Sequence, residues 1–299
     1  MTKRSMPPWL LFTLSGLVWG SSFMLIKVGL TAFTPQQVAV GRLGFGAIAL
    51  ALIMVVTRTP LIRDRRALGH IAVVGFFLAG LPLLLWAWVG QFIPSGISAI
   101  FNATTPLLTL VLASIFLPSD RMKLTGILGV LLGAAGLTLV VAPWQYFGTA
   151  ELSGTTWVAY AAALGATMCY AIGFVYLRRM LKTTEFAPVA FTFAQISFGF
   201  VSVLVLAVPS GLFAPAEFNW VALGAVAVLG AIGTGIAYVW NNQVVSAWGS
   251  VRASMVTYVT PVVGVLLGTL LLGEAFSWNE PLGMLVLFAG IALAQGMFT

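Results

Sequence analysis

Ten long apolar stretches occupy almost the whole chain and are separated by short polar connections. A membrane-spanning helix needs about 20 apolar residues, and lipid offers backbone N–H and C=O groups no partners outside the helix. Alternating segments of about ten residues, typical of a membrane barrel, are not seen. The sequence therefore predicts an all-α polytopic membrane protein with ten transmembrane helices, at about 9–29, 36–57, 68–90, 95–117, 123–142, 155–177, 187–208, 219–243, 250–272 and 281–298.

Lysine and arginine occur at every second connection. Short loops rich in these residues stay cytoplasmic, so both termini are predicted to be cytoplasmic. The net charge of +7 is then explained by topology and by anionic membrane lipid, and no nucleic-acid partner is expected. The basic residues at these connections are Lys3, Arg4, Arg58, Arg63, Arg65, Arg66, Arg121, Lys123, Arg178, Arg179, Lys182 and Arg252.

The second half of the chain repeats the first. Thr105-Pro106 in the fourth span matches Thr260-Pro261 in the ninth, 155 residues later. Further matches are Trp19 with Tyr170, Pro35 with Pro188, Gly126 with Gly283 and Gly133 with Gly290. Five is an odd number of crossings, so the second half starts on the opposite side of the membrane. We expect two inverted five-helix repeats (5+5), residues 1–150 and 151–299, an arrangement typical of transporters.

The first span contains Trp19-Gly20-Ser21-Ser22-Phe23, which resembles the opening motif of EamA-type repeats in the drug/metabolite transporter (DMT) superfamily. The same resemblance extends to Lys27, Pro35, Arg42, Pro106, Pro261 and Gly273-Glu274. Within that superfamily the chain looks most like the bacterial amino-acid exporters called YddG. The resemblance implies a ten-helix inverted repeat around a central cavity in the bacterial inner (plasma) membrane, and export of amino acids or related metabolites. The first repeat has Leu117-Pro118-Ser119-Asp120 where the second has Gly273-Glu274, so a role for that glutamate does not carry over.

Polar residues inside the spans are the candidates for a binding site. In the fourth span, Ser98, Asn102 and Thr105 share one face of a regular helix. Such faces line a cavity or, alternatively, mediate ordinary helix packing, which also uses small and hydroxyl residues. The predicted substrate-binding residues are Trp19, Ser22, Arg42, Trp86, Ser98, Asn102, Thr105, Tyr170, Tyr238, Thr257 and Tyr258.

Three of the residues inside the spans have two interpretations each. Pro106 and Pro261 are predicted to be hinges or, alternatively, static kinks. Each proline lacks a backbone N–H, so the carbonyl four residues earlier, at Asn102 or Thr257, loses its usual donor. Such a carbonyl could accept a hydrogen bond from the ammonium group of a substrate. Arg42 either binds a substrate carboxylate or caps carbonyls and lipid phosphates, and the second interpretation is favoured.

The charged residues argue against several classes of protein. All seven carboxylates lie in connections or at span ends, which disfavours a proton-driven antiporter for cations. Motifs for a metalloprotease or a nucleotide-binding P-loop are not found, so no enzyme, catalytic residue, metal or cofactor is expected. Aromatic residues inside the spans would give a cavity walls that suit an apolar or aromatic ligand.

The sequence favours a secondary transporter that exports small neutral, apolar or aromatic amino acids or related metabolites by alternating access. A monomer is compatible with the sequence. An exporter of other drugs or metabolites in the same fold, and a non-transporting pore or scaffold, are the alternatives.

Overall fold

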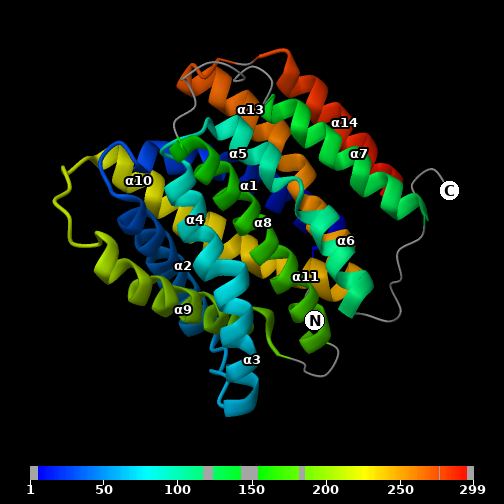
Figure 1. The fold of residues 1–299 in the computed structure, drawn as a ribbon. Helices are drawn as coiled ribbons and strands as arrows, with labels where there is room; N and C mark the ends of the chain where they lie inside the picture. The colour runs from blue at the N-terminus through cyan, green and yellow to red at the C-terminus, as the bar shows by residue number, and fades with distance from the viewer. Residues whose placement is uncertain (1–5, 117–123, 143–153, 182–185, 276, 295–299) are drawn as a thin grey trace.

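The protein is a bundle of long helices (Figure 1). The structure, a computed structural model, describes residues 6–116, 124–142, 154–181, 186–275 and 277–294. Within these residues, nine helical stretches are long and apolar enough to cross a membrane, and a shorter apolar helix forms the tenth. The predicted all-helical fold with ten membrane helices is confirmed.

The first five spans follow the predicted ranges closely. They are α1 (Pro8–Gly29), α2 (Pro35–Thr57), α3 (Arg65–Gly75) continued by the π-helical segment η1 (Phe76–Gly80) and α4 (Leu81–Val89), then α5 (Ser95–Asn102) with α6 (Thr105–Phe116), and α7 (Leu124–Val141). Proline occupies the first position of α1 and α2, where a missing N–H does no harm.

The last five spans repeat this pattern. They are α8 (Gly154–Leu181), α9 (Pro188–Ala207) with η3 (Val208–Ser210), then α10 (Trp220–Val228), η4 (Leu229–Ile236) and α11 (Ala237–Trp248), then α12 (Ser250–Ser254), η5 (Met255–Tyr258) and α13 (Val259–Leu272), and finally α14 (Asn279–Ala294). The π-helical segments η1 and η4 interrupt the third and eighth spans at matching places. The fourth and ninth spans are also irregular at matching places.

Each of the two carbonyls that the prolines deprive of a backbone donor accepts a hydrogen bond from a threonine hydroxyl, which the sequence expectation did not include. The Thr105 hydroxyl donates to the Asn102 carbonyl at 2.7 Å, and the Thr260 hydroxyl donates to the Thr257 carbonyl at 2.7 Å. Each threonine immediately precedes its proline, so its side chain supplies a hydrogen bond that the proline nitrogen lacks. Each of these backbone oxygens therefore keeps one of its two lone pairs for another donor.

Glycines let helices from the two halves approach closely. A Cβ at Gly75 would meet the backbone of Gln195 and Gly199 in α9, and one at Gly230 would meet the backbone of Arg42 and Gly46 in α2. Gly75 and Gly230 are 155 residues apart, the same spacing as Pro106 and Pro261. The π-helical segments begin beside these two crossings, at Phe76 and at Leu229.

Matched helices α7 and α14 pack against each other and run antiparallel. Gly133 in α7 lies against Gly290 in α14, whereas Val140, further along α7, lies against Gly283, which is earlier in α14. A side chain at any of these glycines would meet backbone or side-chain atoms of the other helix. The pairing agrees with the predicted 5+5 layout.

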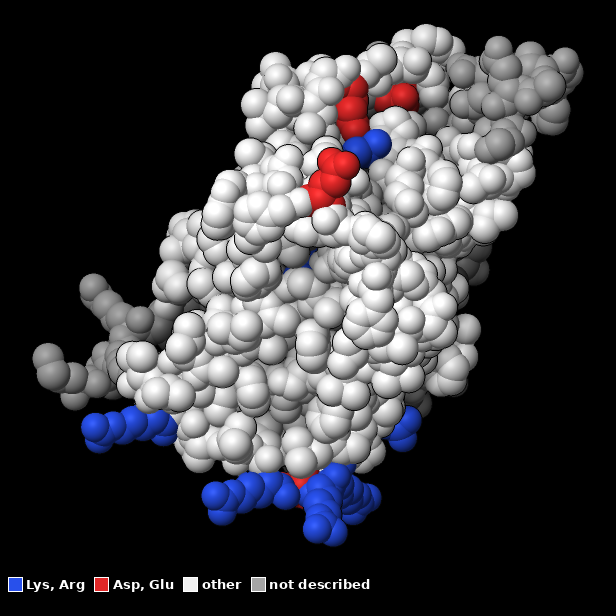
Figure 2. Space-filling model, turned by 90° about the vertical axis from the view of Figure 1, so that its left-hand side faces the viewer, with Lys and Arg blue, Asp and Glu red and all other residues white. Residues whose placement is uncertain are grey.

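Charged side chains separate along the molecule. Figure 2 shows Lys and Arg gathered at one end, and Asp or Glu side chains with a basic group near the other. The described basic residues that flank helix ends are Arg58, Arg63, Arg65, Arg66, Arg178, Arg179 and Arg252. Several predicted features lie outside the described residues, namely Lys3, Arg4, Leu117–Lys123, the boundary at 150–151, Glu151, Lys182 and Glu185.

Candidate functional site

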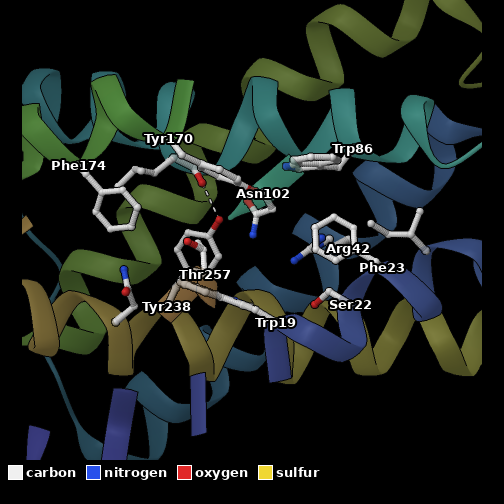
Figure 3. Close-up of a pocket in the computed structure, with 13 residues that line it drawn as sticks. Trp19, Ser22, Phe23, Arg42, Trp86, Asn102, Tyr170, Phe174, Tyr238 and Thr257 are labelled. Carbon is white, nitrogen blue, oxygen red and sulfur yellow. Dashed lines mark hydrogen bonds between the residues drawn. The ribbon is translucent and has the colours of Figure 1, made fainter. Parts of the chain in front are cut away.

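A cavity lies between the two halves of the chain (Figure 3). Its walls come from α1, α2, η1, α4 and α5 in the first half, and from α8, α11 and η5 in the second. The predicted site residues that line it are Trp19, Ser22, Arg42, Trp86, Asn102, Tyr170, Tyr238 and Thr257.

Three predicted site residues do not line this cavity. Ser98 is buried but is not among the lining residues, and its hydroxyl has no hydrogen-bond partner among the residues that the structure describes. Thr105 is fully buried and bonds to the Asn102 carbonyl. The ring of Tyr258 lies 5.9 Å from that of Phe288 in α14. The predicted polar stripe assumed one regular helix, but the span breaks between Asn102 and Thr105, so Thr105 no longer shares a face with Asn102.

Five lining residues were missed by the sequence argument: Phe23, Ile26, Leu78, Phe174 and Asn241. The four apolar residues give no signal, because they resemble any other residue of an apolar span. Asn241 did carry one, since an amide inside a membrane helix is expensive unless it faces protein, water or a ligand.

Arg42 extends from α2 and is 4% exposed. Its Nε donates to the Thr234 hydroxyl at 2.7 Å, and that hydroxyl donates in turn to the Leu229 carbonyl at 3.2 Å. Among the described residues the ion pair is Lys27 with Glu274, so no described carboxylate pairs with Arg42. A buried charge without an opposite charge is costly. The guanidinium therefore creates a strong local preference for an anion in the cavity.

Two aromatic side chains satisfy carbonyls of the π-helical segments. Trp19 Nε1 donates to the Gly233 carbonyl at 2.8 Å, and the Tyr238 hydroxyl donates to the Leu78 carbonyl at 2.5 Å. Leu78 and Gly233 are again 155 residues apart. Four residues after Leu78 stands Pro82, which has no N–H to offer this carbonyl in a regular helix. The π-helical segments thus fix the orientation of the aromatic walls.

These aromatic walls are packed edge to face. The rings of Trp19 and Tyr238 lie 5.3 Å apart at 68°, and those of Phe23 and Trp86 lie 5.1 Å apart at 83°. Such pairs favour rigid placement, because edge-to-face contact is the preferred geometry of aromatic rings. The cavity consequently offers an apolar ligand large and fixed contact surfaces.

Polar atoms without partners also face this region. Trp86 Nε1, a donor, and Asn102 Oδ1, an acceptor, are both buried with no hydrogen-bond partner among the described residues. Figure 3 places Asn102 and Trp86 on the same side of the cavity as Arg42. A donor, an acceptor and a cation on aromatic walls suit a small molecule with an anionic group and a donor group. Over the described ranges, no group of three or more His, Cys, Asp or Glu side chains is arranged to hold a metal ion.

Comparison with a solved crystal structure supports the fold. That structure covers 97% of this chain and 97% of its own, with a TM-score of 0.68 and 20% sequence identity. At this identity the likeness concerns the fold alone.

Relatives among known proteins are membrane transporters. The chain is 29% identical to the uncharacterized inner membrane transporter YedA of Escherichia coli (strain K12) over 94% of this chain and 89% of that protein. It is 28% identical to the uncharacterized transporter YdfC of Bacillus subtilis (strain 168), over 92% and 86% respectively. A probable terminal-alkyne amino-acid exporter of Streptantibioticus cattleyicolor is 29% identical over 54% of this chain and 52% of that protein. The model of the EamA-like transporter family matches residues 6–142 and 157–295. The chain, a multi-pass membrane protein, therefore belongs to the EamA-like transporter family.

Proposed function

We propose that this protein is a secondary transporter that exports small neutral amino acids, preferably apolar or aromatic ones, from the bacterial cytoplasm across the inner membrane. The observation that carries the proposal is Arg42, a buried guanidinium that lines the cavity and has no carboxylate partner among the described residues. A substrate carboxylate supplies the missing charge, and arginine is well suited to bind both carboxylate oxygens.

The rest of the cavity matches the other parts of an amino acid. Asn102 Oδ1 is a buried acceptor without a donor, which an ammonium group would satisfy. The edge-to-face pairs of Trp19 with Tyr238 and Phe23 with Trp86 provide apolar surface for a side chain. The name of the Streptantibioticus cattleyicolor relative, a probable amino-acid exporter, points the same way.

The proposed mechanism is alternating access between two inverted repeats, residues 1–150 and 151–299, with both termini cytoplasmic. The antiparallel packing of α7 on α14 and the matching irregularities of the third and eighth spans support it. Irregular helices lining a cavity between repeats are typical of transporters of this kind. Rocking of one half against the other would open the cavity first to one side of the membrane and then to the other.

A competition panel in proteoliposomes tests the substrate class. L-phenylalanine should inhibit its own uptake at lower concentration than phenylpropionate, which lacks the ammonium group, or phenethylamine, which lacks the carboxylate. Arg42→Gln should weaken phenylalanine competition about ten- to a hundredfold, because a hydrogen bond to a charged group is worth roughly 1.5–3 kcal/mol. Arg58→Gln, the same substitution at the exposed end of α2, is the matched control and should change little.

The outcomes separate the alternatives. Flux that does not saturate indicates a pore, and no flux of any amino acid or metabolite indicates a scaffold. Competition by phenylpropionate equal to that of phenylalanine indicates an exporter of carboxylate metabolites. Stronger competition by phenethylamine, or unchanged affinity in the Arg42→Gln variant, contradicts the proposed role of Arg42.

A further inference from the structure

Asn241, on α11, is an amide that no structural role explains. It is 3% exposed and lines the cavity, and its side chain makes no hydrogen bond to any described residue. The next residue, Asn242, has similar burial at 5% but donates to the Thr192 hydroxyl and to Gln195 Oε1, both at 2.9 Å. Asn242 therefore holds α11 against α9, whereas the amide of Asn241 remains available to a ligand.

The position of Asn241 along α11 sets its distance from the arginine. Thr234, which binds Arg42, precedes it by seven residues in the same span. The span is π-helical up to Ile236 and α-helical from Ala237, so Asn241 lies about two turns further along it than Thr234. Tyr238 lies between them, with its ring 5.3 Å from that of Trp19. The cavity thus has a cationic end, an aromatic middle and a second polar end.

The labelled side chains in Figure 3 show the same order. Arg42 and Phe23 lie toward one end, Phe174 lies toward the other, and Tyr170 and Tyr238 lie between them. A substrate that binds Arg42 through its carboxylate and extends along the aromatic middle would direct the tip of its side chain toward Asn241.

We propose that Asn241 determines specificity by binding a hydrogen-bonding group at the tip of the substrate side chain, so that tyrosine is preferred over phenylalanine. An amide both donates and accepts, which matches a hydroxyl group. A phenyl tip would leave the buried amide without a partner, and sites built to bind a hydroxyl discriminate strongly against analogues that lack it. This inference rests on the proposed function, because it takes the carboxylate to be bound at Arg42.

The test compares L-tyrosine with L-phenylalanine as competitors in proteoliposomes. In the wild type, tyrosine should bind about tenfold more tightly than phenylalanine, the value of one buried hydrogen bond of about 1.4 kcal/mol. Asn241→Leu has a similar volume and should weaken tyrosine about tenfold while changing phenylalanine less than about threefold. Gln243→Leu is the matched control: the same kind of change, two residues away, at a residue that lines a different pocket, and it should leave the ratio unchanged.

The wild-type ratio alone decides the matter if the variant does not fold. A ratio near one overturns the inference, and so does equal weakening of both amino acids by Asn241→Leu, which would place this residue at the ammonium group. These results leave amino-acid export standing. The failure of every amino acid to compete is a different result, because it removes the proposed function itself.

Discussion

Replacing Glu274 by alanine should lower the thermal stability of the protein more than removal of its ion-pair partner. Glu274 follows the end of α13 and reaches the start of α5 in the other half of the chain. Its carboxylate accepts from the Ser95 N–H at 2.9 Å, from the Ser95 hydroxyl at 2.6 Å and from the Gly96 N–H at 3.3 Å. The residue before α5 is Pro94, whose side chain cannot cap the helix, so the glutamate performs this role.

The contributions give the size of the effect. Loss of a helix cap costs about 0.5–2 kcal/mol. A carboxylate at a helix N-terminus contributes about 0.3–1 kcal/mol, and up to about 2 when partly buried. The pair of Lys27 Nζ with Glu274 Oε1, at 3.6 Å, adds at most about 1 kcal/mol, since the two side chains are 29% and 16% exposed. Glu274→Ala should therefore cost about 2–4 kcal/mol, and Lys27→Ala about 1 kcal/mol or less.

The assay is thermal unfolding of the purified protein in detergent, monitored by the loss of the monodisperse peak in size-exclusion chromatography. At about 2–4 °C per kcal/mol, Glu274→Ala should lower the midpoint by about 4–16 °C. Glu274→Gln, which keeps the acceptor oxygen and removes the charge, should fall between Glu274→Ala and Lys27→Ala. Glu217→Ala is the control, because Glu217 is an exposed glutamate in a connection.

The order of the variants decides whether the reasoning holds. An effect of Lys27→Ala as large as that of Glu274→Ala would mean that the ion pair, and not the cap on α5, dominates. An unchanged midpoint for Glu274→Ala would refute the assigned role altogether.

Two further predictions concern the aromatic wall and the orientation of the chain. Trp19→Ala should shift substrate preference in competition assays away from large aromatic substrates, because it removes the contact with Tyr238 and the hydrogen bond to Gly233. Trp220→Ala is the control: this residue is 77% exposed, so its replacement should change substrate preference little. Equal shifts in the two variants would mean that Trp19 has only a structural role. The orientation can be tested by labelling single cysteines in a variant that lacks Cys169. A cysteine at Ser210 should react with a membrane-impermeant reagent in intact cells, whereas a cysteine at Thr59 should react only after the membrane is permeabilised. The reverse pattern would contradict cytoplasmic termini.

The helices themselves could be read from the sequence because their cause is local. A span is apolar over about 20 residues wherever it lies in the bundle, so hydropathy finds it without knowledge of its neighbours. The irregular places in the fourth and ninth spans could also be anticipated, because proline acts on its own helix. The role of Thr105 and Thr260 was not anticipated: their hydroxyls donate to the carbonyls that the prolines leave without a backbone donor.

The candidate site was predictable only where a residue stands out from its span. Trp19, Arg42, Asn102 and Thr257 are aromatic, charged or polar within apolar helices, and the structure brings them to one cavity. Ser98 stands out in the same way but faces elsewhere. Polarity indicates that a side chain needs a partner, and it does not indicate whether that partner is in the cavity or in a neighbouring helix.

Contacts between the halves were decided by the tertiary structure alone. Arg42 meets Thr234, Tyr238 meets the Leu78 carbonyl, and Glu274 caps α5, although 160 or more residues separate each pair. These contacts depend on the rotation of each helix about its own axis. That rotation is set by the glycines at which two backbones meet, such as Gly75 against Gly199 and Gly230 against Gly46. A single span cannot specify it, because close approach is a property of two surfaces together.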